Sequence, residues 1–125
     1  MEPRRSLHAR SIAMLKSMHY LLAFSPYIYL TAFYSFVIRA TITLGYIPSY
    51  DYPDPKTLHF DIHHEIVWEA FEFSAMGVVL YVALLCFFVA RYKTIDKPAL
   101  SIISVGIGLV LLHLFSDPFF TWFVD

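Results

Sequence analysis

The chain has 125 residues, of which 58% are hydrophobic and only 15% are charged. A soluble domain of this length cannot bury so much apolar surface, since average soluble chains hold about 45–50% apolar and about 25% charged residues. The net charge of −1 gives no reason to expect a nucleic-acid partner, and the lone Cys86, which lies in an apolar run and is interpreted as a packing residue, excludes an intrachain disulfide.

The first segment, residues 1–19, is basic and only weakly apolar. It contains four Lys or Arg residues and a single carboxylate. Cations next to an apolar span favour contact with anionic lipid, so we expect a short helix lying on the membrane surface. The apolar run that follows is too long for a signal peptide, and an organelle transit peptide is the alternative interpretation.

Three apolar stretches are long enough to cross a bilayer, whose hydrocarbon core takes about 20 helical residues. Tyr20 to Ile38 holds nineteen residues without a charge, and Phe73 to Ala90 holds eighteen. A third begins at Pro98, a favoured first-turn residue, and continues to about Ser116. We therefore predict an all-α membrane protein with three transmembrane helices.

The predicted protein divides into seven segments. They are a basic interfacial segment (1–19), a first transmembrane helix (20–39), a Pro/Tyr-rich outer loop (40–61), a second transmembrane helix with an outer extension (62–90), an inner turn (91–97), a third transmembrane helix (98–118) and an aromatic tail (119–125).

Aromatic residues are concentrated in the first span and at the end of the chain. The first span contains Tyr20, Tyr27, Tyr29 and Tyr34, and we expect several of these rings to face lipid headgroups or other protein. After the third span, the pair Asp117-Pro118 interrupts the helix. Four aromatic residues follow it, and we interpret them as an anchor in the membrane interface: Phe119, Phe120, Trp122 and Phe123.

The distribution of cations predicts the orientation of the three spans. Four Lys or Arg residues lie before the first span and three lie in or beside the 91–97 turn, whereas the region 39–72 contains only Arg39 and Lys56. Because positive charge near span ends favours the cytoplasmic side, the N-terminus and the 91–97 turn are predicted inside. The long loop and the C-terminus are then outside.

The outer loop contains short motifs that resemble a known group of proteins. These are the run Leu44 to Tyr50 (LGYIPSY), the PDPK of residues 53–56, His63, and the DPF of residues 117–119. Together they resemble small uncharacterised integral membrane proteins common in bacteria, over the chain from about Arg39 to its end. The resemblance implies a bacterial inner-membrane location and transfers no catalytic residue.

A histidine pair near the start of the second span is a candidate metal site. In His59-x-x-x-His63-His64, a helix at about 100° per residue places His59 and His63 within about 40° of each other, which suits two ligands of one metal ion. His64 points away from that pair. Six histidines in all are too few for a membrane di-iron centre. The alternative is a pair of interfacial histidines without a ligand.

A second candidate site lies within the membrane. His113 and Asp117 share one face of the third span, and His113 lies about 22 Å along the helix from Pro98, in the outer half of the bilayer. Arg39 ends the first span in the same leaflet. Glu69 and Glu72 belong to a stripe of carboxylates on the second span, together with Asp61 and Glu65. We therefore predict a polar cluster made of Arg39, Glu69, Glu72, His113 and Asp117; the alternative is that the charged groups only mark the interface.

Small residues form two helix faces that favour close packing. One comprises Ala70, Ser74 and Gly77 and the other Ser101, Ser104 and Gly108, and we expect both to join helices within the chain; the alternative is that they bind another subunit.

The sequence contains no complete catalytic set, and it identifies no cofactor. We therefore expect a non-enzymatic accessory or assembly subunit of a larger membrane complex or homo-oligomer, with lipid and a membrane protein as partners and no nucleic acid. The alternatives are a ligand-, haem-, metal- or proton-handling protein using His113/Asp117 or His59/His63, and an oligomeric ion pore.

Overall fold

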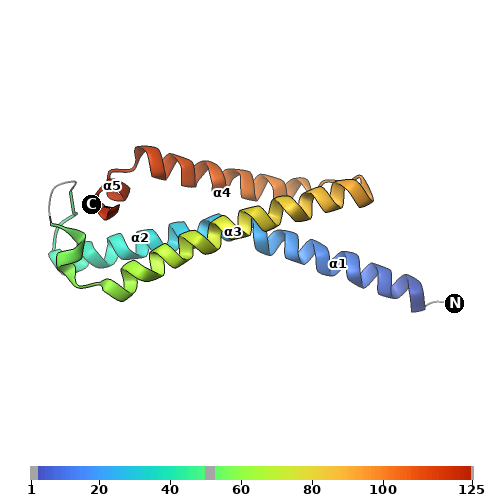
Figure 1. The fold of residues 1–125 in the computed structure, drawn as a ribbon, viewed down its shortest axis with the longest axis horizontal. Coiled ribbons are helices and arrows are strands. Elements are labelled where there is room, and N and C mark those ends of the chain that lie inside the picture. The colour runs from blue at the N-terminus through green and yellow to red at the C-terminus, as the bar shows by residue number, and fades with distance from the viewer. Residues whose placement is uncertain (1–2, 50–52, 125) are drawn as a thin grey trace.

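The computed structural model of the protein describes residues 3–49 and 53–124 (Figure 1). The elements in chain order are α1 (Pro3–Ala23), α2 (Ser25–Leu44), the 3-10 helix η1 (Pro55–Leu58), α3 (Asp61–Tyr92), α4 (Lys97–Ser116) and α5 (Pro118–Val124). Three stretches are long and apolar enough to cross a membrane: Ala9–Leu44, Asp61–Tyr92 and Lys97–Ser116. The predicted all-α membrane fold is therefore confirmed, while its orientation in the membrane stays a prediction.

Local signals in the sequence explain where these helices begin and end. Asp96 caps α4 by accepting the Ala99 N–H at 3.4 Å, and Pro98 follows in the first turn. Gly45 ends α2 in the left-handed conformation, with a φ of 74°, and its N–H donates to the Thr41 carbonyl at 2.9 Å. The start of α4 and the end of α2 are therefore set by capping chemistry that is local in the chain.

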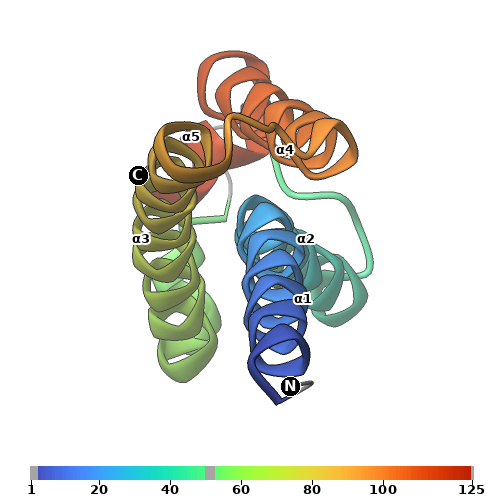
Figure 2. The same ribbon diagram turned by 90° about the vertical axis from the view of Figure 1, so that its right-hand side faces the viewer.

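The helices α1 and α2 follow each other as one long rod with a break at Phe24 (Figure 1). The break precedes Ser25-Pro26, where proline has no N–H to continue the hydrogen-bond ladder. Residues 3–19 of the predicted surface segment therefore belong to a helix that continues to Ala23, while residues 1 and 2 lie outside the described residues. His19 and Ala23 in the last turns of this helix are buried. Seen along the rod, α3 and α4 lie on different sides of it (Figure 2). Both pack against α1 and α2, and they make little contact with each other.

The closest helix crossings occur where the rod breaks. A Cβ added to Gly77 of α3 would lie 2.4 Å from Cβ of Ser25, and one added to Gly106 of α4 would lie 3.0 Å from Cβ of Pro26. The Ser74 hydroxyl also donates to the Ser25 carbonyl at 2.6 Å. The predicted small-residue face of α3 thus packs within the chain at Ser74 and Gly77.

The small-residue face of α4 behaves differently. Ser101, Ser104 and Gly108 are all exposed, and a Cβ on Gly108 would meet no atom within 4 Å. The expectation that this face joins helices within the chain was wrong. Gly106, two residues earlier than Gly108 and so on the other side of the helix, makes the contact with α2 instead.

The end of the bundle near the long loop is closed by α5. Trp122 and Phe123 are 1% and 3% exposed, and the Trp122 indole N–H donates to the Pro53 carbonyl at 2.6 Å. Phe123 stacks on His64 with ring centroids 4.4 Å apart. These two rings therefore fill the core between α2, α3 and the loop, and the prediction that they anchor in the membrane interface was wrong. The chain turns back at Asp117-Pro118, which carries the rings inward.

Candidate functional site

The four tyrosines of the first span form one set, which we call the tyrosine ladder: Tyr20, Tyr27, Tyr29 and Tyr34. Each hydroxyl contacts α4 or one of the residues that cap it. The contacts run from Tyr20 to the Asp96 carboxylate (3.3 Å), from Tyr27 to the Ile102 carbonyl (2.9 Å), from Tyr29 to the His113 ring (3.0 Å) and from Tyr34 to the Asp117 carboxylate (2.5 Å). The ladder thus binds both ends of α4 to the α1–α2 rod.

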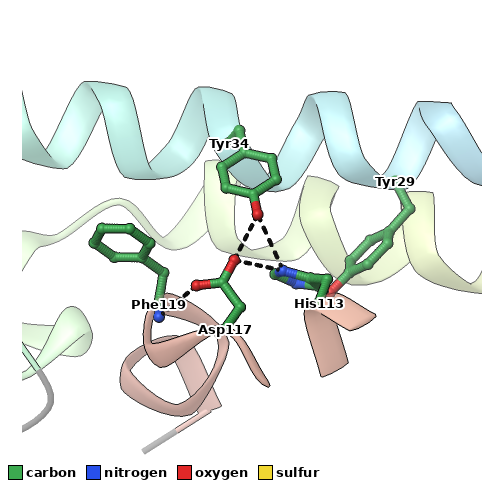
Figure 3. A network of polar contacts seen from close by, with 5 residues as sticks. All are labelled: Tyr29, Tyr34, His113, Asp117 and Phe119. Carbon is green, nitrogen blue, oxygen red and sulfur yellow. Dashed lines mark hydrogen bonds and ion pairs between the residues drawn. The ribbon is translucent and has the colours of Figure 1, made fainter. Parts of the chain in front are cut away.

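At the end of the ladder lies a compact polar network centred on His113 (Figure 3). His113 is 4% exposed, and its Nδ1 lies 2.8 Å from Oδ2 of Asp117. Because an ionised carboxylate only accepts hydrogen bonds, we assign the proton to Nδ1, which leaves Nε2 to accept from the Tyr29 hydroxyl at 3.0 Å. Both ring nitrogens of His113 are therefore engaged within the chain.

Asp117 uses both carboxylate oxygens. Oδ2 accepts from Tyr34 and from His113, and Oδ1 accepts the Phe119 N–H at 2.8 Å, at the start of α5 (Figure 3). One carboxylate therefore joins α2, α4 and α5.

Aromatic rings surround His113 on several sides. The ring centroids of Phe33, Tyr29 and Phe120 lie 4.3, 5.6 and 5.3 Å from that of His113. With both nitrogens bonded and the ring enclosed, binding of a metal or haem iron to His113 would require breaking the bond to Tyr29 or to Asp117. The arrangement suits a fixed hydrogen-bonded joint between helices.

The other members of the predicted polar cluster lie elsewhere. The guanidinium of Arg39 lies over the Phe60 ring, 4.1 Å from its centroid, and 3.5 Å from Nδ1 of His63. Glu69 and Glu72 are exposed on α3 and form no hydrogen bond or ion pair with another described residue. The structure thus brings together His113 and Asp117 and leaves Arg39, Glu69 and Glu72 apart from them.

His59 and His63 line one cavity but do not share a helix. His59 ends η1 in the left-handed conformation, with a φ of 54°, and α3 begins only at Asp61, so the helical spacing of the predicted ligand pair is not formed. His63 Nε2 lies 3.0 Å from the Ser35 hydroxyl. Within residues 3–49 and 53–124, no three His, Cys, Asp or Glu side chains are placed to hold a metal ion. The metal site stays a prediction.

Sequence reasoning missed two sets of polar side chains that the structure places between helices. The first is Tyr29 and Tyr34, whose signal was the unusual number of tyrosines in an uncharged span. The second is His19, which is 1% exposed and packs against Tyr81 and Phe88 with ring centroids 4.9 and 4.8 Å apart. Neither ring nitrogen of His19 has a hydrogen-bond partner among the residues that the structure describes. Nothing in the spacing of the sequence distinguished this buried histidine.

Comparison with known proteins identifies no relative: no protein-family model, curated protein or solved structure matches this chain.

Proposed function

We propose that this chain is a non-enzymatic membrane protein of the bacterial inner membrane that serves as an accessory or assembly subunit of a larger membrane complex or homo-oligomer. The observation that supports this proposal most directly is the uncovered small-residue face of α4. The inner-membrane location rests on the resemblance of the loop motifs to small bacterial membrane proteins.

The interior polar groups support a structural rather than a chemical role. The four hydroxyls of the tyrosine ladder all bond to α4 or its capping residues. Both nitrogens of His113 are engaged as well. The groups best suited to ligation or proton transfer therefore hold the helices together, and none of them offers an open position to a substrate.

The α4 face supports association with another helix. Gly77 and Gly106 allow close approach inside the chain, whereas Ser101, Ser104 and Gly108 form a second surface of the same kind that no described residue covers. Small side chains let helix backbones approach closely in a bilayer, and this favours a partner helix over lipid at the face. The proposal assigns that position to a second membrane protein or to a second copy of this chain.

Native mass spectrometry of the chain released from its own membranes in mild detergent tests the proposal. We expect it to arrive with stoichiometric membrane-protein subunits or as a homo-oligomer. Arrival as a lone monomer at every detergent concentration would contradict the proposal.

A pair of matched variants connects the assembly to the α4 face. Gly108→Leu adds bulk to the small-residue face, and Val79→Leu adds bulk to α3 at a position that is 66% exposed. We expect Gly108→Leu to abolish the assembly and Val79→Leu to leave it intact, with both variants folded by circular dichroism. Equal behaviour of the two variants would exclude this face as the interface.

A further inference from the structure

A polar cavity lies where α2 ends and α3 begins. It has a volume of about 480 Å³, and its lining includes Arg39 from α2, His59 and Phe60 from the connection between η1 and α3, and Asp61, Ile62 and His63 from the first turn of α3. Arg39 lies five residues before the end of α2, close to the point at which the apolar span gives way to the long loop. This is the depth at which lipid headgroups meet a membrane protein.

The side chain of Arg39 is held in place by a chain of hydrogen bonds. Its Nη1 donates to Nδ1 of His63 at 3.5 Å, so the proton of a neutral His63 is on Nε2, which donates to the Ser35 hydroxyl at 3.0 Å. The Ser35 hydroxyl donates in turn to the Ala32 carbonyl at 2.7 Å. The guanidinium carbon of Arg39 also lies over the Phe60 ring, 4.1 Å from the ring centroid. Arg39 is exposed, and its contacts with His63 and Phe60 orient the guanidinium.

Most of the hydrogen-bonding capacity of Arg39 remains unused. A guanidinium has five N–H donors, and among the described residues this one donates only to His63. The one ion pair among those residues is His113–Asp117, so no described carboxylate neutralises Arg39. An oriented cation with free donors beside a cavity is suited to a phosphate group, which a guanidinium binds through two parallel hydrogen bonds.

The lining of the cavity also includes a negatively charged side chain, that of Asp61. Asp61 is exposed in the first turn of α3 and forms no ion pair with Arg39. Ile62 and Ile66 extend the lining and are 77% and 49% exposed. The cavity therefore presents a cation, a separate anion and an apolar side, which is the complement of a zwitterionic molecule with a hydrocarbon tail.

We propose that this cavity binds the headgroup of a zwitterionic phospholipid with a primary amine, its phosphate on Arg39, its ammonium on Asp61 and an acyl chain along Ile62 and Ile66. A primary ammonium donates hydrogen bonds to a carboxylate, whereas a trimethylammonium group has no N–H to donate. The cavity therefore selects a phosphatidylethanolamine-type lipid over phosphatidylcholine and over phosphatidylglycerol, which lacks the ammonium. The bilayer itself is the source of the ligand.

Lipid binding to the full chain is measured by native mass spectrometry in detergent. The probes are palmitoyl-oleoyl phosphatidylethanolamine, phosphatidylglycerol and phosphatidylcholine, with inorganic phosphate as a soluble competitor. We expect wild-type protein to bind the ethanolamine lipid about tenfold more tightly than the other two, as one added charge-assisted hydrogen bond allows. Equal binding of the three lipids would overturn the proposal, as would displacement of the lipid by millimolar phosphate.

Three variants test whether Arg39 binds the phosphate and Asp61 binds the ammonium of the headgroup. Arg39→Gln is expected to lose about tenfold in affinity for all three lipids, and Asp61→Asn to remove only the preference for the ethanolamine lipid. Arg91→Gln is the matched control, because Arg91 also lies over an aromatic ring, that of Tyr92, at the far end of α3. If Arg39→Gln and Arg91→Gln bind lipid alike, the site is excluded. Asp61 is exposed and unpaired, so Asp61→Asn gives an answer even if Arg39→Gln fails to fold.

Discussion

We expect Gly77→Ala to lower the free energy of unfolding by about 2 kcal/mol, because the new methyl group has no space. It would lie 2.4 Å from Cβ and 2.5 Å from Oγ of Ser25, an atom pair held at the first residue of α2. Separating the helices to relieve this overlap also lengthens the bond between the Ser74 hydroxyl and the Ser25 carbonyl. The cost therefore exceeds the gain of up to about 1 kcal/mol that alanine brings to a helix. Denaturant titration in detergent micelles, followed by circular dichroism, measures the change.

Gly108→Ala is the matched control for this prediction. Nothing lies within 4 Å of a Cβ at Gly108, so only the gain in helix propensity remains. Because Gly108 also belongs to the proposed partner-binding face, the comparison is made at detergent concentrations at which the chain is monomeric, and there we expect this variant to be unchanged or more stable by up to about 1 kcal/mol. If both variants lose stability equally, the cost at position 77 arises from the helix itself and not from contact with α2.

The two buried histidines should respond to the same substitution with opposite signs. In His113→Phe, the Tyr29 hydroxyl and the Asp117 carboxylate lose a partner, and we expect a loss of about 1–3 kcal/mol in the free energy of unfolding. In His19→Phe, two buried ring nitrogens without a described partner are replaced by carbon, and we expect a gain of about 1 kcal/mol.

A second substitution separates hydrogen bonding from packing at His113. Tyr29→Phe removes the hydroxyl that His113 accepts from. In the double variant with His113→Phe, the loss should be smaller than the sum of the two single losses, because no unpaired hydroxyl remains. Strictly additive losses would show that the bond between Tyr29 and His113 contributes nothing to stability.

The fold was predictable from the sequence to the extent that it depends on local signals. The lengths of the uncharged stretches identified the three spans, and Pro98, the predicted start of the third span, lies in the first turn of α4. The prediction that His113 and Asp117 share a face holds as well, because a spacing of four residues in one helix requires no knowledge of the neighbouring helix.

Relations between helices were less predictable. Whether Gly106 or Gly108 faces α2 depends on the rotation of α4, and both glycines have the same local sequence signal. Arg39 and Glu72 can lie at one membrane depth and still face different directions, and depth alone led to their assignment to one cluster. The position of α5 depends on a turn at Asp117-Pro118 and on the distant Pro53 carbonyl that Trp122 reaches. Such contacts join residues that are distant in the sequence, so the hydropathy pattern does not predict them.

Because α3 and α4 pack separately on the α1–α2 rod, we expect the protein to assemble in the order of its synthesis. Both α3 and α4 pack on α1 and α2 and make little contact with each other. The second half of the chain therefore has no helix interface that would hold it together without α1 and α2. During synthesis the α1–α2 rod enters the membrane first, and it provides the surface on which α3 and then α4 dock. A fragment beginning at α3 would insert as two helices with no fixed mutual orientation. The order of insertion is thus also the order of folding.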